Sequence, residues 1–192
     1  FETLTVSSGT ASTTVVDDRD ATSVSLSASG GGTEGQSITY TATLGAQADA
    51  DAYVTLSNGS VITIASGTSS GTVSVAARTD DIYNQGTTTV TASISSATGG
   101  NFETLTVSSG TASTTVVDDQ DATSVSLSAT GGGTEGQSIT YTATLGAVAE
   151  ANAYVTLSNG SVITIASGAS TGTVSVAGRS DDIYTEGTTT IT

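Results

Sequence analysis

The 192-residue sequence predicts an all-β fold, and three observations support this prediction. First, apolar and polar residues alternate along short segments such as residues 36–44, as expected for half-buried strands. Second, no segment has the apolar period of a helix, and the abundant Thr, Ser and Val favour sheet over helix. Third, residues 1–91 recur at 102–192 without insertion, and only 12 of the 91 aligned pairs differ. The fold is therefore expected to be a repeated domain of about 100 residues.

The alternation predicts about seven strands in each repeat, separated by turn-forming residues. They cover residues 22–28, 36–44, 52–57, 60–65, 71–77, 87–96 and 102–117. This pattern predicts tandem immunoglobulin-like (Ig-like) antiparallel β-sandwich domains, arranged end to end. The Asn58-Gly59 pair predicts a type I′ hairpin turn. Because the chain has no Trp, Tyr53 is expected to fill part of the core volume that Trp occupies in Ig domains.

The strand assignment also predicts the domain limits. Residues 1–20 are interpreted as the last strand and linker of a preceding repeat, 21–121 as a complete Ig-like repeat, and 122–192 as a second repeat truncated in its sixth strand. Two interpretations of these limits remain open. Either the chain is a fragment cut without regard to its domains, or residues 1–17 of one chain complete domain 122–192 of another by head-to-tail strand complementation.

The composition excludes several classes of function. The chain has no Cys, His or Lys and a net charge of −15, so thiol or imidazole catalysis, Schiff-base chemistry, disulfides and His/Cys metal sites are excluded. The scarcity of basic residues argues against binding to nucleic acid, and no apolar run suits membrane insertion. A glycosidase-like pair of carboxylates would need an apolar pocket, whereas these carboxylates lie in predicted loops, so we expect no enzymatic activity. The acidic excess indicates cations as ligands instead.

The carboxylates are concentrated in the predicted loops and linkers. In an Ig-like strand order, the loop after the first strand, the loop before the sixth strand and the end of the last strand meet at one pole. These segments carry Glu34, Asp80, Asp81, Asp118, Asp119 and Asp121, and the following repeat contributes Glu150 and Asn152. Clustered hard oxygen ligands at irregular spacing suit Ca²⁺. Taken singly, each loop is also explained by Asp and Gly in ordinary turns.

Four segments carry a resemblance to a known family. They are TEGQSITYTATL, VTLSNGSVITIASGTSSGTVSV, DDIYNQGTTTVTASI and TASTTVVDD. Together they resemble the tandem extender repeats of giant bacterial RTX-type adhesins, which are biofilm and ice-binding surface proteins. The Glu-Gly and Asp-Asp-x-Tyr elements are also similar to the acidic loops of Calx-β domains.

The resemblance implies a calcium-stabilised spacer that projects a distal binding head away from the bacterial cell surface and is exported by type I secretion. The partners are then neighbouring repeats of the same chain. The implied Ca²⁺ ligands are Asp17, Asp18, Asp20, Glu34, Asp80, Asp81, Asp118, Asp119 and Asp121, with Glu135, Asp181, Asp182 and Glu186 in the second copy. Gln85 stands where Glu186 stands in the second copy, so that site has one charge less. The alternative is a repeat that itself binds glycan or ice through its Thr-rich strands.

Overall fold

The computed structural model describes residues 2–191, and its regular structure consists of strands. Within this part of the chain, no helix is long and apolar enough to cross a membrane. The residue contacts divide the chain into two compact units. Unit 1 comprises Phe1–Asp80 and Gly86–Asp118, and unit 2 comprises Asp81–Gln85 and Asp119–Thr192.

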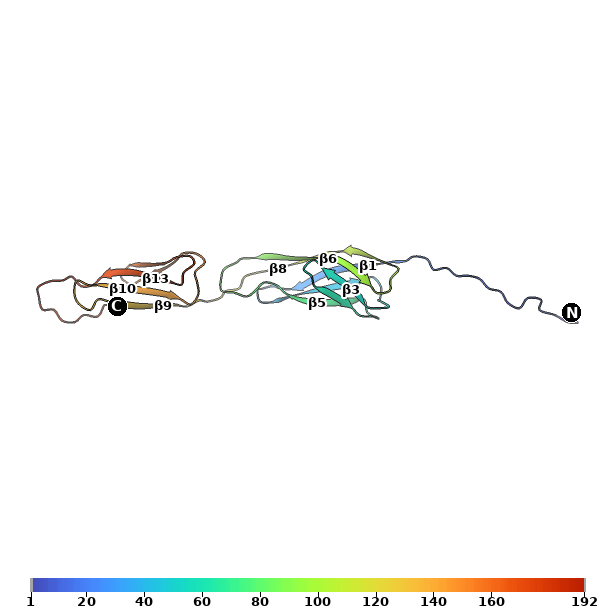
Figure 1. Ribbon diagram of the computed structural model, residues 1–192, viewed down its shortest axis with the longest axis horizontal. Coiled ribbons are helices and arrows are strands. Elements are labelled where there is room, and N and C mark those ends of the chain that lie inside the picture. Colours follow the sequence, from blue (N-terminus) through green and yellow to red (C-terminus); the bar gives the residue numbers. More distant parts are fainter. Residues whose placement is uncertain (1, 192) are drawn as a thin grey trace. The chain divides into compact units, whose positions relative to one another are not determined.

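Unit 1 is a sandwich of two four-stranded sheets (Figure 1). The first sheet has the order β5-β2-β1-β7 and contains β1 (Ala21–Gly30), β2 (Ser37–Leu44), β5 (Ser70–Ala76) and β7 (Thr104–Ser109). The second sheet has the order β4-β3-β6-β8 and contains β3 (Ala52–Leu56), β4 (Val61–Ile64), β6 (Thr88–Gly99) and β8 (Thr111–Val116). The prediction of an all-β sandwich is confirmed.

The core of unit 1 is aliphatic and is built from the alternating residues of both sheets. In β2, the side chains of Ile38, Tyr40, Ala42 and Leu44 are buried, while those between them are at least partly exposed. They pack in one cluster with residues of the opposite sheet such as Val54. The prediction that Tyr53 fills the core is wrong, because Tyr40 is the buried aromatic residue and Tyr53 is 45% exposed.

The last predicted strand, 102–117, is divided in two. β7 runs parallel to β1 in the first sheet, whereas β8 runs antiparallel to β6 in the second sheet. Gly110 lies between them, and its carbonyl oxygen accepts a hydrogen bond of 2.6 Å from the Ile94 amide. The prediction of one continuous strand is therefore wrong, because the chain crosses from one sheet to the other at Gly110.

The β3–β4 hairpin also differs from its prediction. Gly59 has a φ of 84°, but Asn58 is not among the non-Gly residues with positive φ, as a type I′ turn would require. The Gly59 amide bonds to the Leu56 carbonyl at 3.0 Å, and the Leu56 amide bonds to the Ser60 carbonyl at 2.8 Å. These bonds describe a three-residue loop closed by a left-handed glycine, so the type I′ prediction is wrong.

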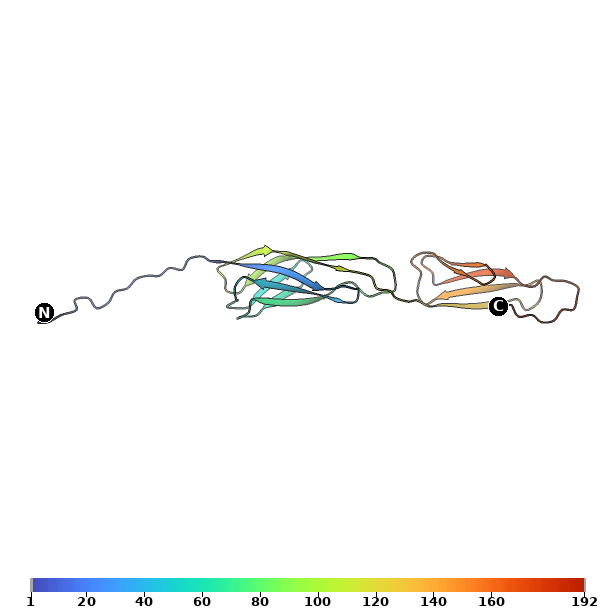
Figure 2. The same ribbon diagram turned by 180° about the vertical axis from the view of Figure 1, so that it is seen from behind.

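Unit 2 repeats five of these strands (Figure 2). They are β9 (Val125–Gly131), β10 (Ser138–Leu145), β11 (Ala153–Thr156), β12 (Val162–Ile165) and β13 (Thr171–Ala177). They form a three-stranded sheet of order β13-β10-β9 and a separate β11-β12 pair. The buried cluster of this unit is smaller and consists of Tyr141, Ala143, Ile163 and Ile165.

Candidate functional site

One end of unit 1, which we call the acidic pole, is formed by residues 31–36, residues 77–80 and the Val117–Asp118 end of the unit. Backbone hydrogen bonds join these three segments. The Glu34 amide donates to the Val117 carbonyl at 3.0 Å, and the Gly35 amide donates to the Arg78 carbonyl at 2.9 Å. Gly35 has a φ of 71°, which L side chains rarely adopt. The loops therefore meet at one pole, as the strand order predicted.

Glu34 is the central carboxylate of the acidic pole. It is only 3% exposed, and its Oε2 accepts a hydrogen bond of 2.8 Å from Arg78 Nε. Its Oε1 is buried and has no hydrogen-bond partner. Burial raises the pKa of Glu34 above its usual value of 4.5; Arg78 lowers it in part and Asp118 raises it further. One buried carboxylate oxygen thus remains available to a cation.

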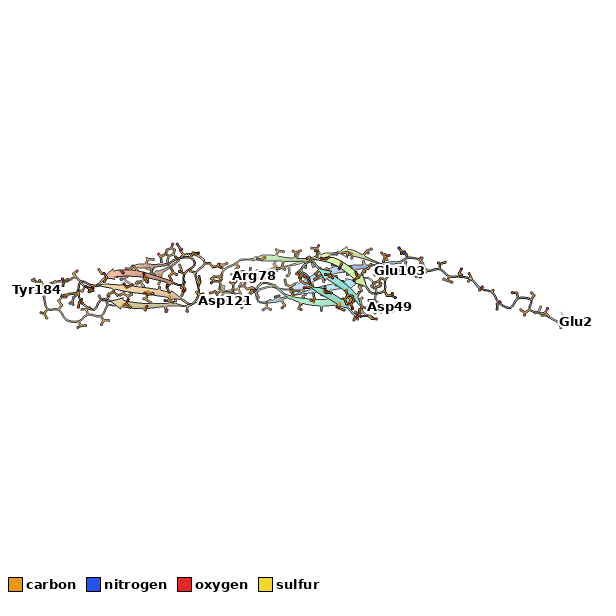
Figure 3. The ribbon with its side chains drawn as sticks, viewed as in Figure 1. Glu2, Asp49, Arg78, Glu103, Asp121 and Tyr184 are labelled. Atoms are coloured by element: carbon orange, nitrogen blue, oxygen red, sulfur yellow. The ribbon has the colours of Figure 1, made fainter. Side chains whose placement is uncertain are left out.

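Arg78, which Figure 3 labels, forms side-chain hydrogen bonds that connect the segments of the acidic pole. Its Nη2 lies 3.2 Å from Asp118 Oδ1, and its Nη1 donates to the Gly86 carbonyl at 3.1 Å. Arg78 and its counterpart Arg179 were not among the site residues predicted from the sequence. A signal was present, because two of the three basic residues of the chain occupy the same place in the two repeats.

The two aspartates of the loop after β5 have different surroundings. A carboxylate oxygen of Asp80 lies within 4.8 Å of one of Glu34, and the Asp80 side chain borders Gly35 so closely that a Cβ there would come within 3.1 Å. Asp81 belongs to unit 2 and accepts hydrogen bonds from the Tyr83 amide at 2.8 Å and from the Gln85 side chain. Asp80, rather than Asp81, is therefore the partner of Glu34.

The corresponding pole of unit 2 has a similar arrangement. Arg179 Nη2 lies 2.9 Å from Glu135 Oε2, and Arg179 Nε lies 3.0 Å from Glu186 Oε2. A Cβ on Gly136 would meet the Asp181 Cβ at 3.1 Å, as at Gly35 in unit 1. Asp182 accepts the Tyr184 amide at 2.8 Å. The structure thus places Glu135, Asp181 and Glu186 around Arg179 and Gly136, whereas Asp182 stabilises a turn.

The linker aspartates fall into two groups. Asp118 pairs with Arg78, and Asp119 and Asp121 of unit 2 offer carboxylate oxygens within 4.8 Å of each other. The Asp20 amide donates to the Glu103 carboxylate, which lies at the opposite end of unit 1 from Arg78 (Figure 3).

The first linker, which contains Asp17, Asp18 and Asp20, is thus not brought to the Glu34 pole of unit 1. The hydrogen bond from the Asp20 amide lowers the pKa of Glu103, but Asp17, desolvation and the Asp20 charge together outweigh it, so this pKa lies above its usual value. Asp18 is exposed.

The residues predicted to join from the second repeat have local roles. Asn152 Oδ1 accepts the Ser167 amide at 3.0 Å, and the Glu150 carbonyl accepts the Ser167 hydroxyl at 2.6 Å. Also in unit 2, the Tyr83 hydroxyl donates to the Val148 carbonyl at 2.9 Å. The Asn152 side-chain oxygen is therefore engaged in joining the loop before β11 to the turn after β12.

Comparison with known protein families gives one match. A family model described as LapA domain matches residues 20–119 and 121–192. A search of curated proteins found no match. The family model therefore matches the chain twice, in two successive ranges.

Proposed function

The chain belongs to the LapA domain family of bacterial surface adhesins, and we propose that it is a calcium-rigidified extender of a long cell-surface adhesin. In this role, tandem repeats space a distal binding head away from the cell. LapA adhesin domains are in general non-enzymatic, which agrees with a mechanical role. The near identity of the two copies supports the proposal, because a spacer gains length by repeating one module.

The observation that carries the calcium proposal is the buried, unpartnered Oε1 of Glu34. An orphaned buried carboxylate oxygen is unfavourable unless a cation or a donor completes it. Arg78 binds the other oxygen of Glu34, and a carboxylate oxygen of Asp80 lies within 4.8 Å of one of Glu34. A divalent cation bound by these two carboxylates would remove the unsatisfied atom.

The donor set favours Ca²⁺ over other metals. The chain has no His or Cys, so every side-chain ligand is an oxygen. Ca²⁺ accepts 6–8 oxygen ligands in flexible geometry, whereas Mg²⁺ requires a near-ideal octahedron. Extracellular calcium modules typically bind at about 10⁻⁴–10⁻³ M, which suits folding after export from a low-calcium cytosol. Type I secretion and membership of the RTX class are part of this proposal.

The rigidifying role depends on the linker aspartates. Unit 1 ends at Asp118, which Arg78 holds at the acidic pole, and Asp119 is the next residue of the chain. We expect Asp119 and Asp121 to add ligands to the ion bound at Glu34 and Asp80. Without the ion, these carboxylates repel one another, and the linker keeps its rotational freedom.

Calcium binding is tested by isothermal titration calorimetry of the 192-residue chain. Glu34→Gln and Asp80→Asn are each expected to lower the calcium affinity of the acidic pole at least about tenfold, because each variant removes a charged ligand. Glu2→Gln is the matched control, because it removes the same charge from an exposed position outside the proposed ligand set. Unchanged binding in the two ligand variants would contradict the proposal.

A further inference from the structure

The chain enters and leaves unit 1 at opposite ends of the sandwich (Figure 1). At the entry, the amide of Asp20, the residue before β1, donates a hydrogen bond to the Glu103 carboxylate. At the exit, Asp118 follows β8 and pairs with Arg78 at 3.2 Å. Figure 3 places Glu103 and Arg78 at the two opposite ends of the unit. A pull on the chain at both sides of unit 1 therefore acts along its strands.

The first and last strands of unit 1 run in the same direction. β1 pairs in parallel with β7, beginning with Ala21 opposite Thr104. Farther along, an isolated parallel bridge joins Thr33 to Val117, just after β8. Tension that pulls the start of β1 toward the entry and the end of β8 toward the exit must therefore slide these segments past each other. In sliding, all hydrogen bonds between the segments are loaded together, whereas strands pulled apart from one end lose their bonds one at a time.

Hydroxyl groups of β7 add to the bonds between these strands. The Thr106 hydroxyl donates to the Thr22 carbonyl on β1 at 3.1 Å. The register of the pair then shifts between Val24 and Ser25, so that Ser108 is left without a partner residue on β1. The Ser108 hydroxyl donates instead to the Val24 carbonyl at 3.2 Å. A side chain thus bridges the two strands at the point where their backbone pairing is irregular.

The end of β8 is bonded to the continuation of β1 in the same way. The Thr114 hydroxyl donates to the Gly30 carbonyl at 2.9 Å. The Val117 amide donates to the Gly32 carbonyl at 3.0 Å, and the Glu34 amide donates to the Val117 carbonyl at 3.0 Å. The first strand and the loop that follows it are therefore bonded to the last segment of the unit from its entry to its exit.

We propose that unit 1 is a force-bearing clamp, in which the hydroxyl groups of Thr106, Ser108 and Thr114 hold the first strand against the last two. Under tension between its two ends, the unit must break these bonds together with the β1–β7 ladder before either strand leaves its sheet. The clamp rests on the proposed function for its use, because a spacer between a cell and an attached head transmits tension. The three hydroxyl groups are not among the proposed calcium ligands, so calcium binding and mechanical resistance can fail independently.

The direction of pulling is tested with optical tweezers on the 192-residue chain in EDTA. The chain has no native Cys, so Arg19→Cys with Gln120→Cys attaches handles at two exposed positions on either side of unit 1. Arg19→Cys with Gln47→Cys is the control, because Gln47 follows the end of β2, where Leu44 pairs with Val24 near the start of β1. The control pair pulls β1 and β2 apart from one end. We expect a higher unfolding force for the first pair of handles, and an equal or lower force would overturn the proposal.

The hydroxyl groups are tested at constant force between the handles at positions 19 and 120. Thr106→Val with Ser108→Ala is expected to raise the unfolding rate of unit 1 about tenfold or more, because two hydrogen bonds that resist sliding are lost.

The matched control is Thr39→Val with Ser74→Ala. These two residues join their hydroxyl groups at 3.3 Å in the same sheet, but between β2 and β5 rather than between the first and last strands. We expect this control to change the unfolding rate under force by much less, while urea denaturation confirms that both variants fold. Equal acceleration by the two double variants would overturn the proposal.

Discussion

At the scale of single residues, the acidic pole is an ion-pair network that leaves one atom unsatisfied. Arg78 joins Glu34 and Asp118, so one guanidinium faces two carboxylates. The positive charge offsets part of the desolvation of Glu34, but its Oε1 remains without a partner. The sequence predicted Glu34 and Asp80 as neighbours but not Arg78, because long-range ion pairs leave no local pattern in a sequence.

Tyr40 makes unit 1 sensitive to alkaline pH. Burial raises the pKa of the Tyr40 phenol above its usual value of 10.0. The unfolded chain therefore loses this proton at lower pH than the folded unit does. The stabilising contribution is fully present below about pH 10 and is lost as the pH rises through the folded pKa. Tyr40→Phe should make the alkaline fall in the free energy of unfolding shallower, as measured by urea denaturation at pH 9–11.

The control for Tyr40 is Tyr53→Phe, which removes a hydroxyl group from a ring that is 45% exposed. We expect this variant to keep the alkaline loss of the parent chain. If Tyr40→Phe and the parent lose stability in parallel between pH 9 and 11, burial of Tyr40 does not govern the alkaline response.

At the scale of strands, alternation predicted most elements within a few residues. The division of the last strand into β7 and β8 was missed, although the sequence carries a signal. Before Gly110, the apolar residues Leu105 and Val107 occupy odd positions, whereas Ala112 and Val116 after it occupy even positions. Side chains alternate between the two faces of a strand with period two. This change from odd to even positions therefore indicates that one strand ends and another begins at Gly110. The hairpin turn was missed because Asn-Gly is compatible with several loop geometries.

Equivalent strands of the two units should respond differently to the same substitution. Leu26→Ala in β1 removes a side chain that is 5% exposed and is expected to destabilise unit 1 by about 2–5 kcal/mol. Leu127→Ala in β9 removes its half-exposed counterpart and should change the stability of unit 2 by less than about 0.5 kcal/mol. Thermal and urea unfolding of the two variants and of the parent chain compare these losses. Equal losses would contradict the difference in burial between the two leucines.

At the scale of the whole molecule, charge and repetition define the proposed role. The net charge of −15 is concentrated in loops and linkers, and the strand faces are largely neutral. On the proposed function, we expect divalent cations to act on the linkers and to leave the sandwiches unaffected. The sequence motifs pointed to a bacterial adhesin family, whereas the unsatisfied oxygen of Glu34 could be found only from the structure.

Small-angle X-ray scattering of the chain in EDTA and in about 1–5 mM CaCl₂ tests the central claim most directly. MgCl₂ controls for ionic strength, and Asp119→Asn with Asp121→Asn removes the linker ligands. We predict that calcium alone narrows the distribution of particle dimensions and lengthens the particle, and that the linker variant loses this response. Identical scattering profiles with and without calcium would contradict the account and leave the acidic loops as ordinary turns.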